Sequence, residues 1–552
     1  MHFLFFCEKG EEMSFAVQEF EYRGIRRIEI PKVDADFRGG DFGLSILKKY
    51  LPNILATHNQ NAKKVKYFYD YFLGMQDILA KERPYNKDKG NNHREVENHA
   101  YRQVTFKKGF LTGEHREYTH KTGTKSDDLA VLDRYFTDCK FFPKDGALKE
   151  WIYATGIGAT HTSPRTDIII SDGIDKITGE PIVRFATPEE GFNIEFNAPF
   201  KYSVVDPSEN FVVYSSRFDK EPLFCVSIVD IDVSEEKNVL PEIRKEILVE
   251  TRYASFMVHS DALYTKFYDS IEYKKTKAFP YLPIVEYWTN QSRMGLVELN
   301  RSCFNLINTI KSSVADMTVD KSNVILVFKN TDIGKAEIEE LSNAGAVILK
   351  DQQNGRNTVE ADFDTVTIEI PFEGLNQYIE TQLSACYDIA GVPLASGQVT
   401  SGGDTGQARL LGGGWNNAYI VINDDINALL NSDYDQLALM FLICKQYPNC
   451  PLNELYPSQV DIKYRINQND NLLIKTQGIM NLYSVNMPFD EIVKVSGLFG
   501  DVTTVTKKWE ESDKKAKEQN KISETIQVEE PTGDAKIDNR VVGASNGNDS
   551  QE

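Results

Sequence analysis

Apolar residues recur at helical spacing in three long segments of the second half of the chain. Within 296–314 they stand three or four positions apart, which predicts one apolar stripe along a long helix. A second stripe of this kind covers 375–390 and stops at the Gly-Val-Pro sequence of 391–393. A third helical region extends over 408–446, and the three glycines of 412–414 predict a kink or break within it.

Shorter patterns add strands to these helices. Runs of β-branched and aromatic residues between turn signals predict a β-rich module over 165–290, and an alternating run predicts a strand at 460–466. The segment between the first two long helices predicts a compact α/β insert with strands at 324–328, 346–349 and 365–370 and a short helix at 335–342. The expected fold class is therefore α+β.

The remaining segments are predicted to be helical or disordered. Helices are expected at 64–80, 472–483, 489–496 and 502–519. The polar chain from 521 to 552 shows no periodicity, which predicts a disordered tail.

The composition constrains the function. The 552 residues include 82 acidic and 62 basic ones, a formal charge of −20, which argues against a protein that grips nucleic acid through a basic face. No stretch reaches the ~18 uninterrupted apolar residues that span a bilayer. The seven cysteines are scattered and odd in number, which predicts buried free thiols in a reducing compartment rather than a disulfide framework.

Motifs for catalysis, metals and cofactors are weak. The glycine-rich 402–408 has no lysine where a phosphate-binding loop needs one, and 156–161 has His161 where a dinucleotide fingerprint needs its third glycine. His115 and His120 have a tolerable metal spacing but no third ligand, so a surface hairpin is favoured over zinc. We therefore predict no catalytic residue, no metal and no cofactor.

Five short segments, in this order, carry a resemblance to a known family. They are YFYDYFLGMQDIL at 67–79, NNHREVEN at 91–98 followed by FKKGFLTG at 106–113, VVDPSENFVVY at 204–214, LPIVEYWTN at 282–290 and YDIAGVP at 387–393. Their order and spacing resemble the portal proteins, or head–tail connectors, of tailed bacteriophages, specifically the large family typical of phages with long flexible tails. The chain departs from the family pattern at 405–408, where a Ser-Gly-x-Ala start is usual, and at the glycines of 412–414.

The resemblance implies a portal fold assembled as a ring of twelve copies. Its implied parts are a wing (1–291), a first stem helix (292–314), a clip (315–373), a second stem helix (374–391), a tunnel loop (392–406), a long kinked helix that returns to the wing (407–469) and a helical crown (470–520). The ring would sit at one capsid vertex of the virion, after assembly in the host cytoplasm, and double-stranded DNA would pass through it. The implied partners are the large terminase subunit, the major capsid and scaffolding proteins and the head–tail adaptor, with no membrane.

The same resemblance implies where the working residues lie. The tunnel-loop candidates are Ser396, Gly397, Gln398, Thr400, Ser401, Gly402, Gly403 and Asp404. The candidate acids of the channel lining are Glu380, Asp388, Asp424 and Asp425. The clip candidates for terminase and adaptor docking are Asp332, Lys335, Glu337, Glu339 and Glu340. Shortening 397–403 is expected to impair DNA packaging while rings still form.

The charge pattern agrees with a conduit for DNA. The segment 374–445 carries seven acids and two bases, a charge of −5 per copy. Cationic contacts would hold DNA through counterion release, so an anionic wall lets the duplex slide. The competing interpretation places these acids on solvated outer faces, since charge runs usually are solvated.

Two other classes of function stay open at this point. One is another virion component, such as an adaptor or tail protein, although adaptors are generally much smaller. The other is a metal- or nucleotide-dependent hydrolase that uses His93, His99, His115 or His120.

Overall fold

The computed structural model describes most of the chain, in two compact units. The described residues are 20–31, 41–81, 92–121, 127–174, 181–232, 243–261, 263–267, 271–321, 325–329, 352–354, 357–359, 362–366, 371–394, 415–447, 449–466, 472–485, 487–496 and 505–515. One unit is formed by 1–120 with 126–468, and the other by 121–125 with 469–552. None of the described helices combines the length and the apolar character that a bilayer crossing requires.

A six-stranded sheet with one long helix on its face forms the first part of the larger unit. The strands, in sheet order, are β1 (Ile28–Ile30), β7 (Asn210–Ser215), β8 (Pro222–Asp232), β9 (Ile243–Thr251), β10 (Ala254–Ser260) and β11 (Glu272–Thr276). Only β1 pairs in parallel, with β7, and the others are antiparallel. The predicted β-rich module is thereby confirmed.

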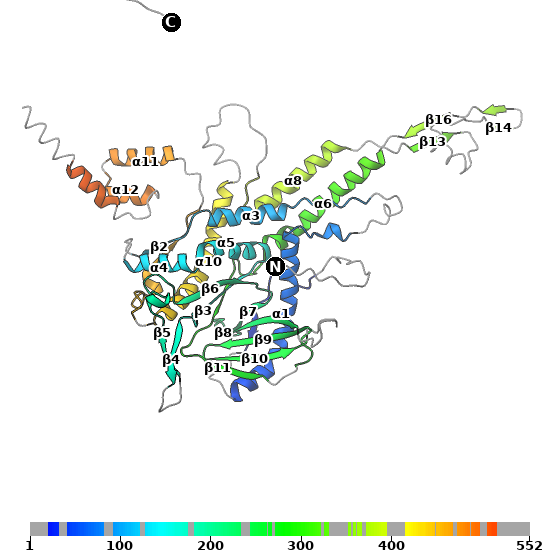
Figure 1. Cartoon of the computed structure of the whole chain (residues 1–552). Helices are drawn as coiled ribbons and strands as arrows, with labels where there is room; N and C mark the ends of the chain where they lie inside the picture. The colour runs from blue at the N-terminus through cyan, green and yellow to red at the C-terminus, as the bar shows by residue number, and fades with distance from the viewer. Residues whose placement is uncertain are drawn as a thin grey trace, which may run out of the picture. The chain divides into compact units, whose positions relative to one another are not determined.

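Helix α1 (Asp41–Phe72) lies along this sheet (Figure 1). Its Leu47, Leu51, Ile54 and Leu55 recur at three- and four-residue spacing and are buried in one cluster with the strands. The helix predicted over 64–80 is therefore the end of a much longer one, and it stops at Phe72 because Gly74, at φ +106°, turns the chain.

A second layer joins distant parts of the chain. The three-stranded sheet has the order β12 (Ile284–Tyr287), β3 (Gly158–Pro164) and β6 (Phe200–Val205), and β4 (Ile169–Ile174) pairs with β5 (Pro181–Phe185). The helices α3 (His99–Thr112), α4 (Asp127–Asp138) and α5 (Phe141–Thr155) belong to the same unit.

The segment that contains His115 and His120 is not the expected surface hairpin. β2 (Glu117–His120) pairs antiparallel with β17 (Val460–Lys463), from far along the chain. His115 stacks on Phe142, with ring centroids 4.2 Å apart. Local sequence could not indicate this pairing, because the partner strand lies in the last fifth of the chain. The predicted strand at 460–466 is confirmed in β17.

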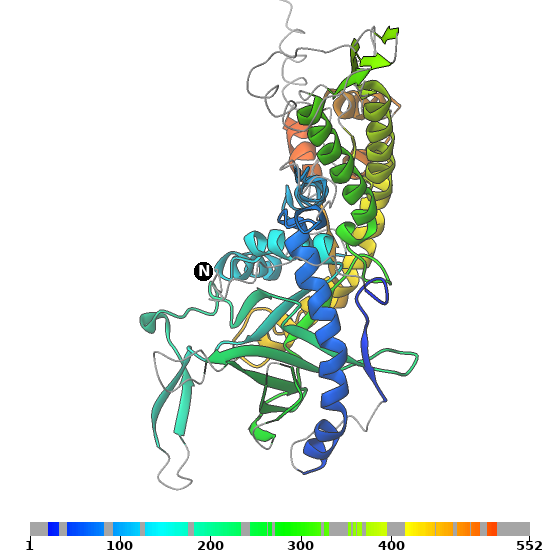
Figure 2. The same cartoon turned by 90° about the vertical axis from the view of Figure 1, so that its right-hand side faces the viewer.

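The three long helices predicted from apolar spacing are confirmed, with shifted bounds. They are α6 (Leu296–Lys321), α8 (Phe372–Ala390) and α10 (Trp415–Cys444), and Figure 2 shows them side by side. α8 ends where predicted, because Gly391 adopts φ +60° and donates its N–H to Asp388 O. The glycines of 412–414 lie outside the described residues.

Between α6 and α8 the structure describes four strands. β13 (Ile325–Lys329) pairs with β16 (Asp362–Val366), and β14 (Gln352–Asn354) pairs with β15 (Asn357–Val359). The strand predicted at 324–328 is confirmed, whereas the one predicted at 365–370 is found earlier, as β16. The helix predicted at 335–342 and the strand predicted at 346–349 lie outside the described residues.

Two cysteines are paired, contrary to the expectation of free thiols. Cys303 of α6 and Cys386 of α8 form a disulfide that links residues 83 apart in sequence. The packing of the two helices brings these side chains together, which their scattered spacing did not reveal. Four other described cysteines, Cys139, Cys225, Cys444 and Cys450, are free.

The glycines of 156–158 have a structural role. Gly156 ends α5 at φ +95°, and a Cβ there would lie 2.3 Å from Arg293 O. A Cβ on Gly158 would lie 2.8 Å from side-chain atoms of Leu148 and Ile152. Close packing of the end of α5 against residues 293–295, and of β3 against α5, explains these glycines without a bound nucleotide.

The smaller unit contains α11 (Leu472–Ser484), α12 (Phe489–Ser496) and a helix over 505–515. These three helices were predicted. The Trp509 ring stacks on that of Phe489 at 4.2 Å and meets that of Tyr483 edge-on. The predicted disordered tail, 521–552, lies outside the described residues.

Candidate functional site

The candidate channel acids lie on α8 and α10, and both helices share an apolar cluster with α6. Val297 and Phe304 of α6, Tyr387 of α8 and Ile422 of α10 are fully buried in one apolar cluster. Burying a side chain of this size contributes about 1.5–3 kcal/mol, so this cluster fixes the three helices against each other.

One face of α6 is polar and buried. Asn308, Ser312 and Asp316 lie four residues apart and accept the backbone N–H groups of Glu97, Glu95 and His93, respectively, at 2.8–3.0 Å. The extended segment 92–98 is therefore held along the helix through alternate residues. Sequence reasoning missed this contact, although the four-residue polar spacing was a possible signal.

A second set of amides joins α3 to α6 and α8. Asn300 donates to Gln103 Oε1 at 2.9 Å and to Cys386 O at 3.2 Å. Both amide side chains are buried. Because a buried polar group without a partner is destabilising by about 1–3 kcal/mol, this contact fixes the register of the three helices.

The start of α6 is held by a buried ion pair. Lys64 of α1 donates to Glu298 Oε1 at 3.0 Å, and the two Glu298 oxygens accept the N–H of Gly24. Burial lowers the pKa of Lys64, and Glu298 offsets part of that shift.

A larger buried cluster holds α10 against α5 and β2. Arg116 donates to Asp433 of α10 and to Asp145 of α5, and Tyr464 donates to Asp433 Oδ2 at 2.6 Å. Burial alone would raise the pKa of Asp433, but the nearby Arg116 and Lys149 outweigh it and hold that pKa below its usual value. Asp433 is thus an ionised anchor of α10 and not a lining acid.

Asp425 does not present a free carboxylate either. Its Oδ2 accepts from Lys107 at 3.1 Å and from Tyr153 at 3.0 Å, and the side chain is only 13% exposed. Burial raises the pKa of Asp425 and lowers that of Lys107, and their attraction offsets part of both shifts. The expectation that Asp425 contributes charge to a channel wall is corrected: its neighbour Asp424 points to solvent, whereas Asp425 points to α3.

Three of the four candidate acids are exposed in the single chain. Glu380 and Asp388 lie on α8 and Asp424 lies on α10, all open to solvent. On α8 the two acids are about 80° apart around the helix axis, so they share one side. The structure thus leaves these three acids exposed, whereas all the tunnel-loop candidates (396–404) and clip candidates (332–340) lie outside the described residues.

The four candidate histidines of a hydrolase serve separate structural contacts. His93 Nδ1 lies 2.8 Å from Asp316 Oδ1, and His99 Nδ1 lies 3.0 Å from Tyr387 Oη. His115 stacks on Phe142, and His120 belongs to β2. Among the residues that the structure describes, no three His, Cys, Asp or Glu side chains group as metal ligands.

A comparison with protein families identifies the class. The family model of phage portal proteins described as SPP1 Gp6-like matches residues 51–408. The match includes α1 from residue 51 onward, the strands β2 to β16, α6 and α8, and it ends before α10. Because it covers more than half of the chain, the chain belongs to this family of phage portal proteins, and the resemblance in its sequence is confirmed.

Membership of the phage portal family establishes the general role of the protein. The chain is a phage portal protein, a structural component of the virion that serves packaging of the viral genome. No curated protein matches the chain.

Proposed function

We propose that copies of this chain close into a ring, with twelve copies as the family resemblance implies, around a channel through which double-stranded DNA enters and leaves the capsid. One observation on α6 carries the proposal. The helix buries Val297, Phe304 and Ile307 completely, yet a second apolar stripe remains outside. A helix that is apolar on two faces needs partners on both.

The second stripe of α6 is regular. Leu299, Leu306 and Met317 are 37%, 37% and 49% exposed, and their spacings of 7 and 11 residues place them on one line along the helix. Leu299 and Leu306 lie within 296–314, the segment whose apolar spacing predicts the helix, and both side chains are partly exposed in the single chain. A neighbouring copy that covers the stripe would remove this apolar surface from water.

α8 supplies a matching surface. Tyr378 and Ile389 are exposed and lie about 20° apart around the helix. Contact between the α6 stripe of one copy and the α8 stripe of the next is head-to-tail, and such contacts close into rings when the rotation permits.

The acids give the ring its proposed channel wall. Glu380 lies on the opposite side of α8 from Tyr378 and Ile389, and Asp388 lies about 80–100° from them, so copies that pack through the apolar stripe leave Glu380 free and Asp388 at the border of the contact. With Asp424 they contribute three negative charges per copy, repeated around the ring. Such a wall repels phosphates and does not hold the duplex.

The remaining parts follow the family order. The wing would be 1–291, the stem helices 292–314 and 374–391, the clip 315–373, the tunnel loop 392–406, the long helix with its return 407–469 and the crown 470–520. The clip, with Asp332, Lys335, Glu337, Glu339 and Glu340, would dock the terminase and later the adaptor. The capsid and scaffolding proteins would hold the ring at the vertex, after assembly in the host cytoplasm.

Deleting 397–403 tests the tunnel loop. The small polar residues Ser396 to Asp404 would make weak contacts to DNA that do not depend on sequence. We expect the deletion to reduce DNA-filled capsids at least about tenfold, measured by nuclease-protected DNA, while ring assembly is unchanged.

A variant of equal length provides the control. Replacing 397–403 with seven glycine and serine residues keeps the length and the weak contacts, so it should package as the original chain does. Normal packaging by the deletion variant would contradict the role assigned to this loop.

A further inference from the structure

The turn between β7 and β8 presents a large apolar side chain to solvent. Phe218 is 96% exposed, more than any other large apolar residue of the described chain. The turn is nevertheless well fixed: Lys220, at φ +48°, donates its N–H to Arg217 O and pairs with Glu29. Burying a side chain of this size contributes about 1.5–3 kcal/mol, so Phe218 is suited to a contact with another surface.

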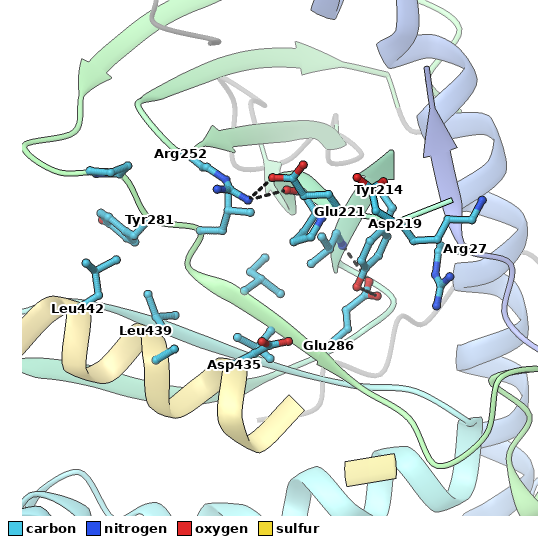
Figure 3. Close-up of a pocket in the computed structure, with 18 of the residues that line it drawn as sticks. Arg27, Tyr214, Asp219, Glu221, Arg252, Tyr281, Glu286, Asp435, Leu439 and Leu442 are labelled. Atoms are coloured by element: carbon cyan, nitrogen blue, oxygen red, sulfur yellow. Dashed lines mark hydrogen bonds and ion pairs between the residues drawn. The ribbon is translucent and has the colours of Figure 1, made fainter. Parts of the chain in front are cut away.

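A groove of about 790 Å³ lies near the same turn, between residues of β7, β8 and β12 on one side and α10 on the other (Figure 3). Its apolar wall consists of Tyr281, Leu282, Trp288, Ala438, Leu439 and Leu442. A volume in this range holds several side chains.

Most charges of the groove are already paired. Arg252 donates to Glu221 at 3.0 Å, and Tyr214 donates to Glu286 at 2.9 Å, as Figure 3 shows. Glu286 also pairs with Arg293 at 3.0 Å. These contacts shape the walls of the groove, whereas Arg27, Asp219 and Asp435, which also line it, form no ion pair among the described residues.

Asp435 is the acid that α10 contributes to the groove. It lines the groove from α10 with an exposed side chain, and within the described residues it makes no hydrogen bond or ion pair. The surrounding walls raise the pKa of its carboxyl through desolvation. A cation that entered with an apolar side chain would find both an apolar wall and an unpaired carboxylate here.

The β7–β8 turn carries such a pair of side chains. Arg217 precedes Phe218 directly, is exposed, and its guanidinium has no ion pair among the described residues. On its own chain the turn is held at the rim, where Asp219 and Lys220 line the groove, and Phe218 stays in solvent. The groove of its own chain therefore does not receive Phe218.

We propose that the turn 216–221 of one copy docks into the groove of a second copy, with Phe218 against Trp288 and Leu439 and with Arg217 paired to Asp435. The proposal rests on the ring proposed above and names a second contact in it, apart from the long helices. Both surfaces occur on every copy, and their apolar and charged groups are complementary, which favours a second copy over a foreign partner. An aromatic anchor in a pocket is the usual centre of such an interface.

The variant Phe218→Ala tests the anchor. We expect the concentration at which half of the chains are in rings to rise at least about tenfold, measured by mass photometry on the full chain. Leu263→Ala is the matched control, because Leu263 is also exposed and apolar but lies outside the turn and the groove. It should leave ring assembly unchanged.

Exchanging the two charges tests the proposed ion pair between Arg217 of one copy and Asp435 of the other. Arg217→Glu and Asp435→Arg should each weaken the rings, and the double variant should restore them. In addition, Phe218→Cys combined with Ala438→Cys should give a dimer band with a short thiol cross-linker, whereas the original chain treated alike should not.

The outcomes separate the two proposals. If the original chain forms no ring at any concentration, the proposed function fails. If it forms rings, but Phe218→Ala assembles as well as the original chain and no cross-link appears, the ring stands and the docking of this turn is overturned.

Discussion

Changing Glu380, Asp388 and Asp424 together to lysine is expected to reduce DNA-filled capsids at least about tenfold while rings still assemble. The substitutions change the charge of this surface from −3 to +3 per copy. A cationic wall would bind phosphates with release of counterions, so DNA would be held instead of passed. The amount of nuclease-protected DNA per capsid measures the effect.

The salt response and a matched control make this test specific. Binding to a cationic wall weakens steeply as salt rises, so added salt should partly restore packaging by the lysine variant. Lysine at Asp128, Glu189 and Glu195, which are exposed elsewhere, changes the net charge equally and should package normally. Normal packaging by the first variant, or equal loss in the control, would contradict an anionic channel wall.

Replacing Asp433 with alanine is expected to lower the free energy of unfolding by about 3–5 kcal/mol. The substitution leaves Arg116 buried with Asp145 as its remaining carboxylate and removes the acceptor of Tyr464. The midpoint of urea unfolding should fall with little change in slope. Asp461→Ala, at an exposed pair with Lys463, should change the stability by less than about 1 kcal/mol.

Asp433 is also expected to account for part of the loss of folding stability at low pH. The folded-state pKa of Asp433 lies below its usual value, because Arg116 and Lys149 outweigh the effect of burial. Its contribution is therefore complete above the unfolded pKa of about 3.9 and is lost as the pH falls through the lower, folded pKa. Asp433→Asn should flatten the decline of stability in that acid range, and an unchanged decline would contradict an ionised Asp433.

Spacing along the chain predicted the long helices well, because three- and four-residue recurrence of apolar side chains is a local property. α8 and its stop at Gly391 followed from the sequence alone. The orientation of α6 could not be predicted from the sequence in this way. Leu299 and Leu306 are exposed, and Phe304 between them is buried, since this helix has apolar residues on two sides. Periodicity marks an apolar face but does not say which partner covers it.

Long-range contacts were beyond local patterns. β2 finds its partner β17 near the end of the chain, and the Cys303–Cys386 bond closes over the whole segment between α6 and α8. The burial of the acids at the site could not be predicted from local sequence either. Asp425 is neutralised by Lys107 and Asp433 by Arg116, both more than 300 residues earlier, so exposure could not be predicted from the acids themselves.

Negative-stain electron microscopy of the purified full chain, with native mass spectrometry, tests ring assembly most directly. We expect closed rings with a central hole and a mass that is a multiple of 62.7 kDa, twelve copies if the family number holds. A single species of 62.7 kDa at every concentration, with no ring in the images, would contradict a channel built from many copies.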